Sequence, residues 1–486
     1  MAIAELRGNA KTEGGGLRDP LASDIDDRLV VRSPSPEVIE NSPDRRTWPT
    51  PRRRRRLPAG WPIAAAVAGW PLWWALGVTN LVFPLFAAPL AWQLVKRRNI
   101  RLPSGFWLWA RFLVLFVVSG FAIDVEVAGT ATSTGVGRYF ALTSRLLNYV
   151  AVTVMLLYVG NASEEELPRR RLISWIAFLG VFAVGLGTLA VFLPTFGFPT
   201  AMSAILPESL LGGGDGGQAR LAQVQPVLGE TSPRPSAPFA YTNAWGNNVS
   251  LLLVWVVVAW SALGSRRRQV ALWVLLAVAM VPIVYSLNRG MWIGLGISFV
   301  VVAVRLALRG RVMVLAGMLM LITVASLAFV VSPLQTMVQA RLDEGHSNEV
   351  RGSLAGEAVA AARQSPVIGF GSTRQTLGSD SSIAVGPSDD CPRCGGRDIG
   401  STGQLTLLLI AHGFVGVGLY CGFLIRSVWA YANDHSVLGI AGTLVVGLDL
   451  FYALFYSALT MPLAITFLSI GLLWRNQQLR IAAGHA

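Results

Sequence analysis

The feature that most constrains this chain is a series of long apolar segments separated by short joints that carry arginine and lysine. A helix needs about 20 apolar residues to cross the hydrocarbon core of a bilayer, and only helices or closed barrels satisfy their backbone there. Only 14% of the 486 residues are charged, whereas an ordinary soluble domain has about 25%. The sequence therefore predicts an all-α polytopic integral membrane protein.

We expect twelve transmembrane helices in a domain over residues 59–475. The first two are short and are interrupted by Pro71, Pro84 and Pro89. The expected spans are 61–78, 80–95, 104–123, 139–160, 172–194, 244–263, 270–287, 291–308, 312–331, 402–425, 436–459 and 461–474.

The two ends of the chain have different compositions from this domain. Residues 1–58 are rich in Pro, Ser, Gly, Arg and Asp and lack a periodic apolar pattern, which predicts a disordered tail. This tail ends in five consecutive arginines, Arg52 to Arg56. A basic cluster next to a span marks the cytoplasmic side, so we expect a cytoplasmic N-terminus. Residues 476–486 are expected to form a cytoplasmic C-terminal tail.

The distribution of basic clusters tests this topology. If each span crosses once, the joints expected in the cytoplasm are KRRNIR (96–101), PRRR (168–171), SRRR (265–268), RLALRGR (305–311), Arg426 and RNQQLR (475–480). Every strong basic cluster in a short joint then lies inside, as the positive-inside rule requires. The joints at 124–138, 195–243, 288–290 and 332–401 fall outside, and the last is a large extracytoplasmic loop between the ninth and tenth helices. Long loops of this kind often carry function.

The charge and the cysteines exclude several classes of protein. The formal net charge is +13, but the basic residues sit between spans, so we expect a lipid bilayer and no nucleic acid as partner. Cys391 and Cys394 form CPRC, which is half of a tetrahedral zinc site without a second pair. A local disulfide and two free thiols both remain open. The chain has no P-loop, dinucleotide fingerprint or HExxH motif, and we predict no metal and no cofactor.

Arginines on the outer side are the first candidate binding residues. Arg289 lies in YSLNRGMW, in the tight outer turn between the seventh and eighth spans. One interpretation is an interfacial arginine that reaches the lipid head groups. The other is a phosphate ligand, because guanidinium binds phosphate in a bidentate manner. Arg234, Arg341 and Arg351 lie on the same side, and the four together suggest one cationic pocket for a pyrophosphate or a charged lipid head.

Amides and titratable groups on the same side complete the candidate site. Asn243, Asn247 and Asn248 lie where the sixth span begins, and Trp245 between them offers a stacking face for a sugar. Helix capping and an interfacial position explain part of this pattern. Candidate acids and bases are grouped in the large loop; they are Asp343, Glu344, His346, Glu349 and Glu357.

Four stretches resemble the O-antigen ligase and O-antigen polymerase superfamily of bacterial envelope proteins. They are RPSAPFAYTNAWGNNVSLLL (234–253), YSLNRGMWIGL (285–295), SNEVRGSLAGEAVAAARQSPVIGFG (347–371) and GSTGQLTLLLIAHGFVGVGLY (400–420). The expected twelve spans and the large loop between spans nine and ten are similar to the family layout.

The resemblance implies a metal-independent glycosyltransferase in the cytoplasmic membrane. Its donor would be a glycan linked to polyprenyl pyrophosphate, its acceptor a glycan or glycolipid, and its chemistry would occur on the outer face. The family's two essential arginines carry over to Arg289 and Arg351, with Arg341 as a competitor for the second. They would neutralise the leaving pyrophosphate.

One departure from the family concerns the general base. The family has a histidine entering the tenth span, where this chain has Thr402 and Gly403. Threonine is no base near neutral pH, so either the base lies elsewhere, with Glu349 and His346 as the candidates, or the chain is a divergent polymerase or ligase. Thr402 and Gln404 are expected to contact substrate. Both ligase and polymerase remain open, and a membrane transporter is the alternative from another class.

Overall fold

The computed structural model describes residues 58–131, 136–205, 217–227, 230–262, 264–308, 310, 315–317, 319–320, 323, 346–377 and 397–483. The predicted N-terminal tail up to residue 57, most of the span at 312–331, Arg341 and both cysteines of CPRC lie outside these residues.

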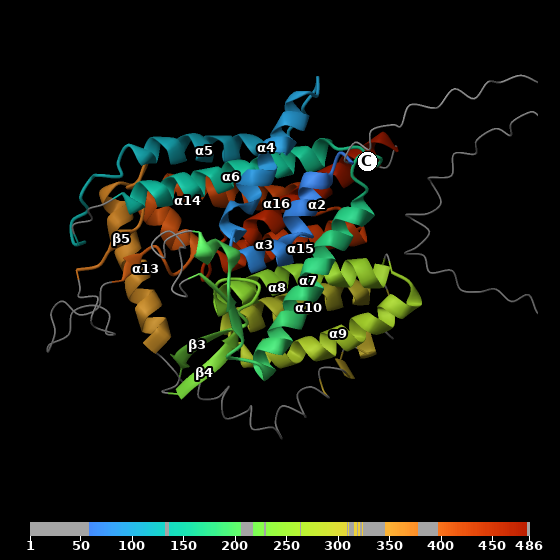
Figure 1. The fold of residues 1–486 in the computed structure, drawn as a ribbon. Helices are drawn as coiled ribbons and strands as arrows, with labels where there is room; N and C mark the ends of the chain where they lie inside the picture. Colours follow the sequence, from blue (N-terminus) through green and yellow to red (C-terminus); the bar gives the residue numbers. More distant parts are fainter. Residues whose placement is uncertain are drawn as a thin grey trace, which may run out of the picture. The chain divides into compact units, whose positions relative to one another are not determined.

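The described chain is mostly helical and contains thirteen α-helices (Figure 1). They are α2 (Trp61–Val67), α3 (Trp70–Leu76), α4 (Val82–Val95), α5 (Phe106–Gly120), α6 (Gly137–Asn161), α7 (Arg169–Phe192), α8 (Thr242–Val257), α9 (Arg266–Tyr285), α10 (Arg289–Leu308), α13 (His346–Gln364), α14 (Gln404–Tyr431), α15 (Val437–Tyr452) and α16 (Met461–Ala482).

Five helices are long and apolar enough to cross a membrane. They are α6, α7, α8 with its π-helical extension to Ala262, α9 and α14. The apolar helices α5 and α15 are shorter, as is the segment Thr79–Val95 that contains α4. These helices confirm a mostly helical fold with several segments suited to a bilayer. The count of twelve crossings stays a prediction.

The helices differ in extent from the expected segments at three places. The span at 61–78 is two short helices, α2 and α3, separated at Ala68 and Gly69. The span at 436–459 ends as a helix at Tyr452. The predicted tail after residue 475 is helical as far as Ala482, where α16 ends.

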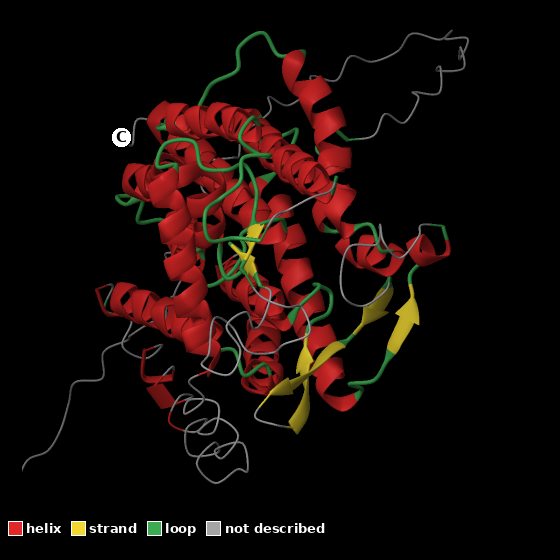
Figure 2. Cartoon of the chain, turned by 90° about the vertical axis from the view of Figure 1, so that its left-hand side faces the viewer, coloured by secondary structure: helices red, strands yellow, loops and turns green. Residues whose placement is uncertain are grey.

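The described fold is also not purely α-helical, because three two-stranded antiparallel ribbons lie among the helices (Figure 2). They pair β1 (Gly197–Pro199) with β2 (Gln218–Arg220), β3 (Ala222–Val227) with β4 (Glu230–Pro235), and β5 (Arg374–Gln375) with β6 (Asp398–Ile399). All three occur in the two loops expected outside the membrane.

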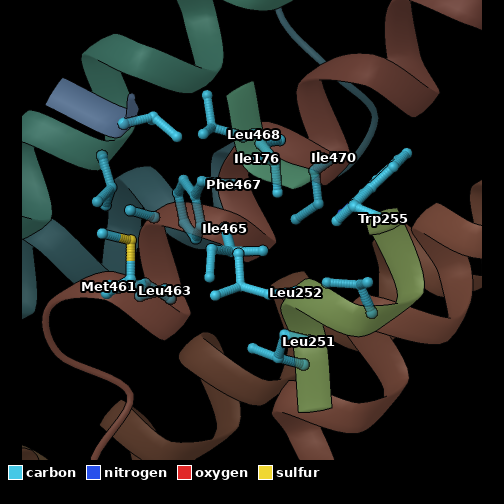
Figure 3. Packing of buried hydrophobic residues seen from close by; sticks show 14 of the residues in the cluster. Ile176, Leu251, Leu252, Trp255, Met461, Leu463, Ile465, Phe467, Leu468 and Ile470 are labelled. Atoms are coloured by element: carbon cyan, nitrogen blue, oxygen red, sulfur yellow. The ribbon is translucent and has the colours of Figure 1, made fainter. Parts of the chain in front are cut away.

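The core is formed where α8 and α16 pack with α6 and α7. Figure 3 shows Leu252 and Trp255 of α8 close to Ile465, Phe467 and Ile470 of α16, and all five side chains are buried. The Trp255 indole donates a hydrogen bond to the Ser469 hydroxyl at 3.1 Å, so its one polar atom is satisfied. This packing holds α8, which carries Asn243 at its N-terminal end, in a fixed position among its neighbouring helices.

Basic joints meet at one end of the helices. The basic joints 96–101, 162–171 and 475–480, together with the joint 432–436 that carries Asp434, are held together there by side-chain bonds. These bonds are Arg97–Glu166 (2.8 Å), Arg169–Asn476 (2.5 Å) and Arg480–Asp434 (2.9 Å). In Figure 1 the C-terminus lies at this end, away from α13 and β5.

A second group of joints meets at the other end. Backbone and side-chain hydrogen bonds link residues 121–131 with 370–376, residues 402–404 with 453–458, and residue 234 with the turn at 286–291. Examples are Ala131 N to Gln375 O (2.9 Å), Arg374 Nη2 to Ile123 O (2.8 Å), Gln404 N to Tyr456 O (2.8 Å) and Arg234 Nε to Ser286 O (2.7 Å). The joints named here therefore fall into two groups, and the alternation of twelve spans stays a prediction.

Helix α14 is broken at Gly413, which adopts φ 63° and ψ −170°. The break frees the carbonyls of Ile410 and Ala411, and these accept hydrogen bonds from the N–H groups of Phe370 (2.9 Å) and Gly371 (2.8 Å). The Phe414 N–H instead donates to the Pro366 carbonyl at 2.9 Å. The SPVIGFG segment (365–371) thus provides hydrogen-bond partners for the backbone groups that the break leaves unsatisfied. These bonds also anchor the C-terminal end of α13.

Candidate functional site

A cavity of about 450 Å³ opens at the end of the helices where the non-basic joints meet. This volume is typical of small-molecule sites. Fourteen described residues line it: Asn243, Leu287, Asn288, Arg289, Gly290, Ile293, Arg351, Gly352, Ala355, Thr402, Thr406, Leu454, Phe455 and Tyr456. They come from five segments that are distant in the sequence.

Arg289 is placed by the turn that begins α10. Leu287 adopts a left-handed φ of 49°, which is uncommon for a residue with a side chain. Asn288 then caps the helix, because its Oδ1 accepts from the Met291 N–H at 3.1 Å. Arg289 follows as the first helical residue and lines the cavity. A left-handed residue and an asparagine cap therefore fix the direction in which α10 leaves the turn.

Arg351 reaches the cavity from α13. Its neighbours on the cavity wall, Gly352 and Ala355, are small and leave space beside the guanidinium. Leu354, Ala358 and Ala361 of α13 are buried and pack against α14 and β6. This packing holds α13 in position, so that Arg351 and Arg289 share one cavity.

Three helix N-termini also meet at this cavity. Asn243 is the second residue of α8, Arg289 is the first of α10, and Thr402 and Thr406 flank the start of α14. The N-terminus of a helix carries a partial positive charge and favours anions. The fourteen described lining residues include two arginines and no aspartate, glutamate or histidine. The described wall of the cavity is therefore suited to bind an anion.

Tyr456 lies on the cavity wall in the connection 453–460, outside α15 and α16. Its hydroxyl donates to Oδ1 of Asn288. Burial raises the pKa of Tyr456 to about 12, although the positive charges of Arg351 and Arg234 act in the opposite direction. The phenol of Tyr456 therefore stays protonated at physiological pH, although the charges of Arg351 and Arg234 act on it.

Thr402, where the resemblance would lead one to expect a histidine, lines the cavity. Its Oγ1 is 3.2 Å from Oγ1 of Thr406, and the Thr406 hydroxyl donates to the Gly403 carbonyl at 2.9 Å. This arrangement places a neutral hydroxyl pair at the start of α14, where the resemblance would place a base.

Three other predicted substrate-binding residues lie outside the cavity lining. Arg234 is buried, and its Nε donates to the Ser286 carbonyl at 2.7 Å, so it supports the turn before Arg289. Asn247 is buried within α8. Gln404 is fully buried; its amide donates to the Tyr149 hydroxyl at 2.8 Å and accepts from the Ala458 N–H at 3.1 Å. Gln404 thus ties α14 to α6 and to the connection that carries Tyr456.

The prediction that Trp245 offers a stacking face for a sugar is wrong. Its side chain has no exposed surface, and its indole N–H donates to the Ala183 carbonyl at 3.1 Å. The residue packs between α7 and α8 and cannot contact a sugar.

The predicted bases are not brought to the described cavity wall. Glu349 is exposed on α13 and is two residues from Arg351. Because a helix turns about 100° per residue, the two side chains lie on nearly opposite faces. His346 is the first residue of α13, and its side chain lies outside the described part of the chain, as does Arg341.

Among the cavity residues that the sequence analysis did not name are Asn288 and Tyr456. Asn288 directly precedes Arg289. Its position as a polar residue beside a candidate phosphate-binding arginine could have indicated it. Tyr456 lies in FYALFYSALT, where a long apolar run hides it.

The described residues contain no group of three or more His, Cys, Asp or Glu side chains placed to hold a metal ion. Comparison of the chain with protein-family models, with curated proteins and with solved structures finds no match. The geometry of the cavity and the sequence resemblance are therefore the basis of the functional proposal.

Proposed function

We propose that the protein is a membrane glycosyltransferase of the O-antigen ligase or polymerase type. It transfers or polymerises a glycan from a polyprenyl-pyrophosphate-linked donor on the outer face of the cytoplasmic membrane. The observation that carries this proposal is that Arg289 and Arg351, from separate motifs of the resemblance, line one cavity.

The cavity has the properties that a pyrophosphate leaving group requires. Each guanidinium offers a planar fork of donors that matches phosphate oxygens. The N-termini of α8, α10 and α14 add partial positive charge. In the reaction, an acceptor hydroxyl attacks the anomeric carbon, the bond from this carbon to the pyrophosphate oxygen breaks, and the arginines neutralise the charge that develops on the departing group. His346 remains the predicted acceptor of the hydroxyl proton.

The membrane arrangement proposed with this function has twelve crossings and both termini in the cytoplasm. The end where basic residues meet would face the cytoplasm under the positive-inside rule. The cavity lies at the other end, so it would open to the outer face, where a lipid-linked glycan is presented. Polyprenyl chains would lie in the bilayer beside the helices.

A transporter is the second candidate, and one observation favours it. Asp449 is 1% exposed within α15. An ionisable residue inside a membrane helix commonly marks an ion or substrate pathway. The cavity with two arginines at one end, however, favours chemistry at a surface over passage through the middle.

Deletion of the gene tests the proposal, with lipid-linked and surface glycans as the readout. A ligase predicts accumulation of long lipid-linked polymer, and a polymerase predicts accumulation of single lipid-linked repeats. Complementation with the wild-type gene should restore surface glycan. Unchanged lipid-linked and surface glycans would contradict the enzyme and favour the transporter.

A further inference from the structure

A second cavity, of about 420 Å³, lies along α9 beside the π-helical end of α8, and we call it the α9 groove. Arg267 is the first of its lining residues along α9, and the others on this helix are Val270, Ala271, Val274, Leu275 and Val278. They recur three and four residues apart, so they form one face of the helix. From Arg267 to Val278 the helix rises about 16 Å at 1.5 Å per residue. This length is close to half of the roughly 30 Å hydrocarbon core of a bilayer.

Trp260 supplies the wall of the groove that α9 does not. It belongs to the π-helix Val258–Ala262, which continues α8. The side-chain amide of Gln269 donates to the Ser261 carbonyl at 3.1 Å and so ties α9 to this π-helix. A Cβ atom at Gly264 would lie only 2.5 Å from the Trp260 carbonyl oxygen. The connection between α8 and α9 is therefore tight, and the groove is built by the packing of two helices.

The surface of α9 is largely uncovered by protein. Only 22% of its most apolar stretch is buried, whereas 39–72% is buried in the other four long helices. Val270 and Val274 in the groove are 59% and 60% exposed. Exposed apolar surface is costly in water but not against hydrocarbon. A lipid acyl chain therefore matches the groove in both polarity and length.

The charge at the start of the groove favours an anionic lipid. Arg266, Arg267 and Arg268 form the first turn of α9, which contains no acidic residue. All three are exposed, and none forms an ion pair with another residue that the structure describes. Cations are unfavourable at a helix N-terminus, because its partial charge is also positive. An anionic head group beside Arg267 would offset this repulsion, whereas a zwitterionic one would add its own ammonium.

We infer that the α9 groove binds an anionic phospholipid of the cytoplasmic leaflet, with its phosphate at Arg267 and one acyl chain along the helix towards Val278. Basic pockets at the cytoplasmic ends of membrane helices bind such head groups. The groove lies at the start of α9, whereas the cavity with Arg289 lies beyond its end at Tyr285. The inference therefore does not depend on the proposed glycosyltransferase, but it requires that α9 crosses the membrane with Ser265 in the cytoplasm.

The first test measures selectivity for the head group. Native mass spectrometry of the purified full-length protein gives the affinity of the first bound lipid, with dioleoyl phosphatidylglycerol as the anionic probe and dioleoyl phosphatidylethanolamine as the zwitterionic one. We expect the wild-type protein to bind the anionic lipid more tightly. Arg267→Gln should weaken this binding roughly 5-fold, as the loss of one basic residue near a lipid surface does. Arg171→Gln, at an exposed arginine in the first turn of α7, is the control and should leave it unchanged.

The second test fills the groove. Val274→Trp places a large side chain among the lining residues and should weaken binding of phosphatidylglycerol, while Val300→Trp, at an exposed position of α10, should not. Thermal unfolding without added lipid should be the same in both variants, because no part of the protein occupies the groove.

Other results would overturn the inference. Equal affinity of the wild-type protein for the two lipids, or equal losses in Arg267→Gln and Arg171→Gln, would show only a general attraction between basic joints and anionic lipid. Unchanged lipid binding in Val274→Trp would place the lipid elsewhere. A lower unfolding temperature in Val274→Trp than in Val300→Trp would show that another part of the chain fills the groove. A dimer that Val274→Trp dissociates would identify a second copy of the chain as the occupant.

Discussion

Gly290 lies so close to Tyr456 that a Cβ atom at this glycine would be 2.3 Å from the tyrosine hydroxyl oxygen. This contact joins the start of α10, which carries Arg289, to the connection after α15. Gly290→Ala should therefore destabilise the protein by about 1–3 kcal/mol, as overpacking does, and should weaken binding in the cavity. Thermal unfolding in detergent measures the first effect.

Two further variants make this prediction specific. Gly290→Ala combined with Tyr456→Phe should recover part of the stability, because the second change removes the oxygen that the new methyl group meets. Gly296 lies on the same helix, and a Cβ added there would meet no atom of the described residues within 4 Å. Gly296→Ala should therefore change stability by less than about 1 kcal/mol. Equal effects of Gly290→Ala and Gly296→Ala would argue against the contact.

The break in α14 depends on Gly413. A Cβ at this position would lie 2.5 Å from the Pro366 carbonyl oxygen, and the φ of 63° disfavours any other residue. We expect Gly413→Ala to lower the unfolding temperature, with a cost of about 1–3 kcal/mol. Gly418→Ala in the same helix meets no such neighbour among the described residues and serves as the control. An unfolding temperature in Gly413→Ala as high as in the control would contradict this role of the break.

Asp434 stabilises the end of the helices at which the basic joints meet, through bonds with Ser436, Asn476 and Arg480. Burial alone would raise the pKa of its carboxyl, but hydrogen bonds from Ser436 and Asn476 and the charge of Arg480 keep this pKa below its usual value. The stabilisation from Asp434 is therefore present above the unfolded pKa of about 4 and is lost as the pH falls through the lower folded value.

Asp434→Asn tests this role of the carboxylate. It should cost about 1–3 kcal/mol at pH 7, and the gap to the wild-type protein should narrow as the pH falls below about 4. Thermal unfolding across pH measures both effects. Glu165→Gln, at an exposed position of the same end, is the control and should show neither a loss of stability at pH 7 nor a change of that loss with pH. A gap that stays constant with pH would show that the carboxylate charge is not involved.

The membrane topology predicts opposite accessibility for two exposed serines, Ser401 near the cavity and Ser265 before α9. In a background without the three native cysteines, Ser401→Cys should react with an impermeant thiol reagent in intact cells. Ser265→Cys should react only after permeabilisation. The reverse pattern would place the cavity in the cytoplasm and would be incompatible with a lipid-linked donor on the outer face.

Hydropathy and the spacing of the charged joints were sufficient to predict the long apolar helices. Those signals are local, because the hydropathy and charge of a helix depend only on the residues of that helix. The end of α15 was not predictable in this way. The Leu405 N–H donates to the Ala453 carbonyl at 2.9 Å, so a tertiary contact stops a helix that the apolar sequence would continue.

The candidate site was predictable where polar residues interrupt apolar runs, as Asn243 and Arg289 do. Tyr456 was missed because its partner, Asn288, is distant in the sequence and only folding brings the two together. The burial of Trp245 was not predictable, because an indole near a span end can be exposed, whereas α7 covers this one. Periodicity indicates which residues are apolar but not which neighbouring helix buries them.

The most direct test of the central claim is glycan transfer in vitro by Arg289→Lys and Arg351→Lys. The donor is the lipid-linked glycan that accumulates in the deletion strain, and Arg363→Lys, an exposed position on α13, is the control. Lysine keeps the charge but loses the planar fork, so we predict that each cavity variant loses about 30- to 1000-fold in rate, or roughly 2–4 kcal/mol of transition-state stabilisation, while Arg363→Lys stays near wild type. Near-normal transfer by both Arg289→Lys and Arg351→Lys, in protein that inserts normally, would contradict the account.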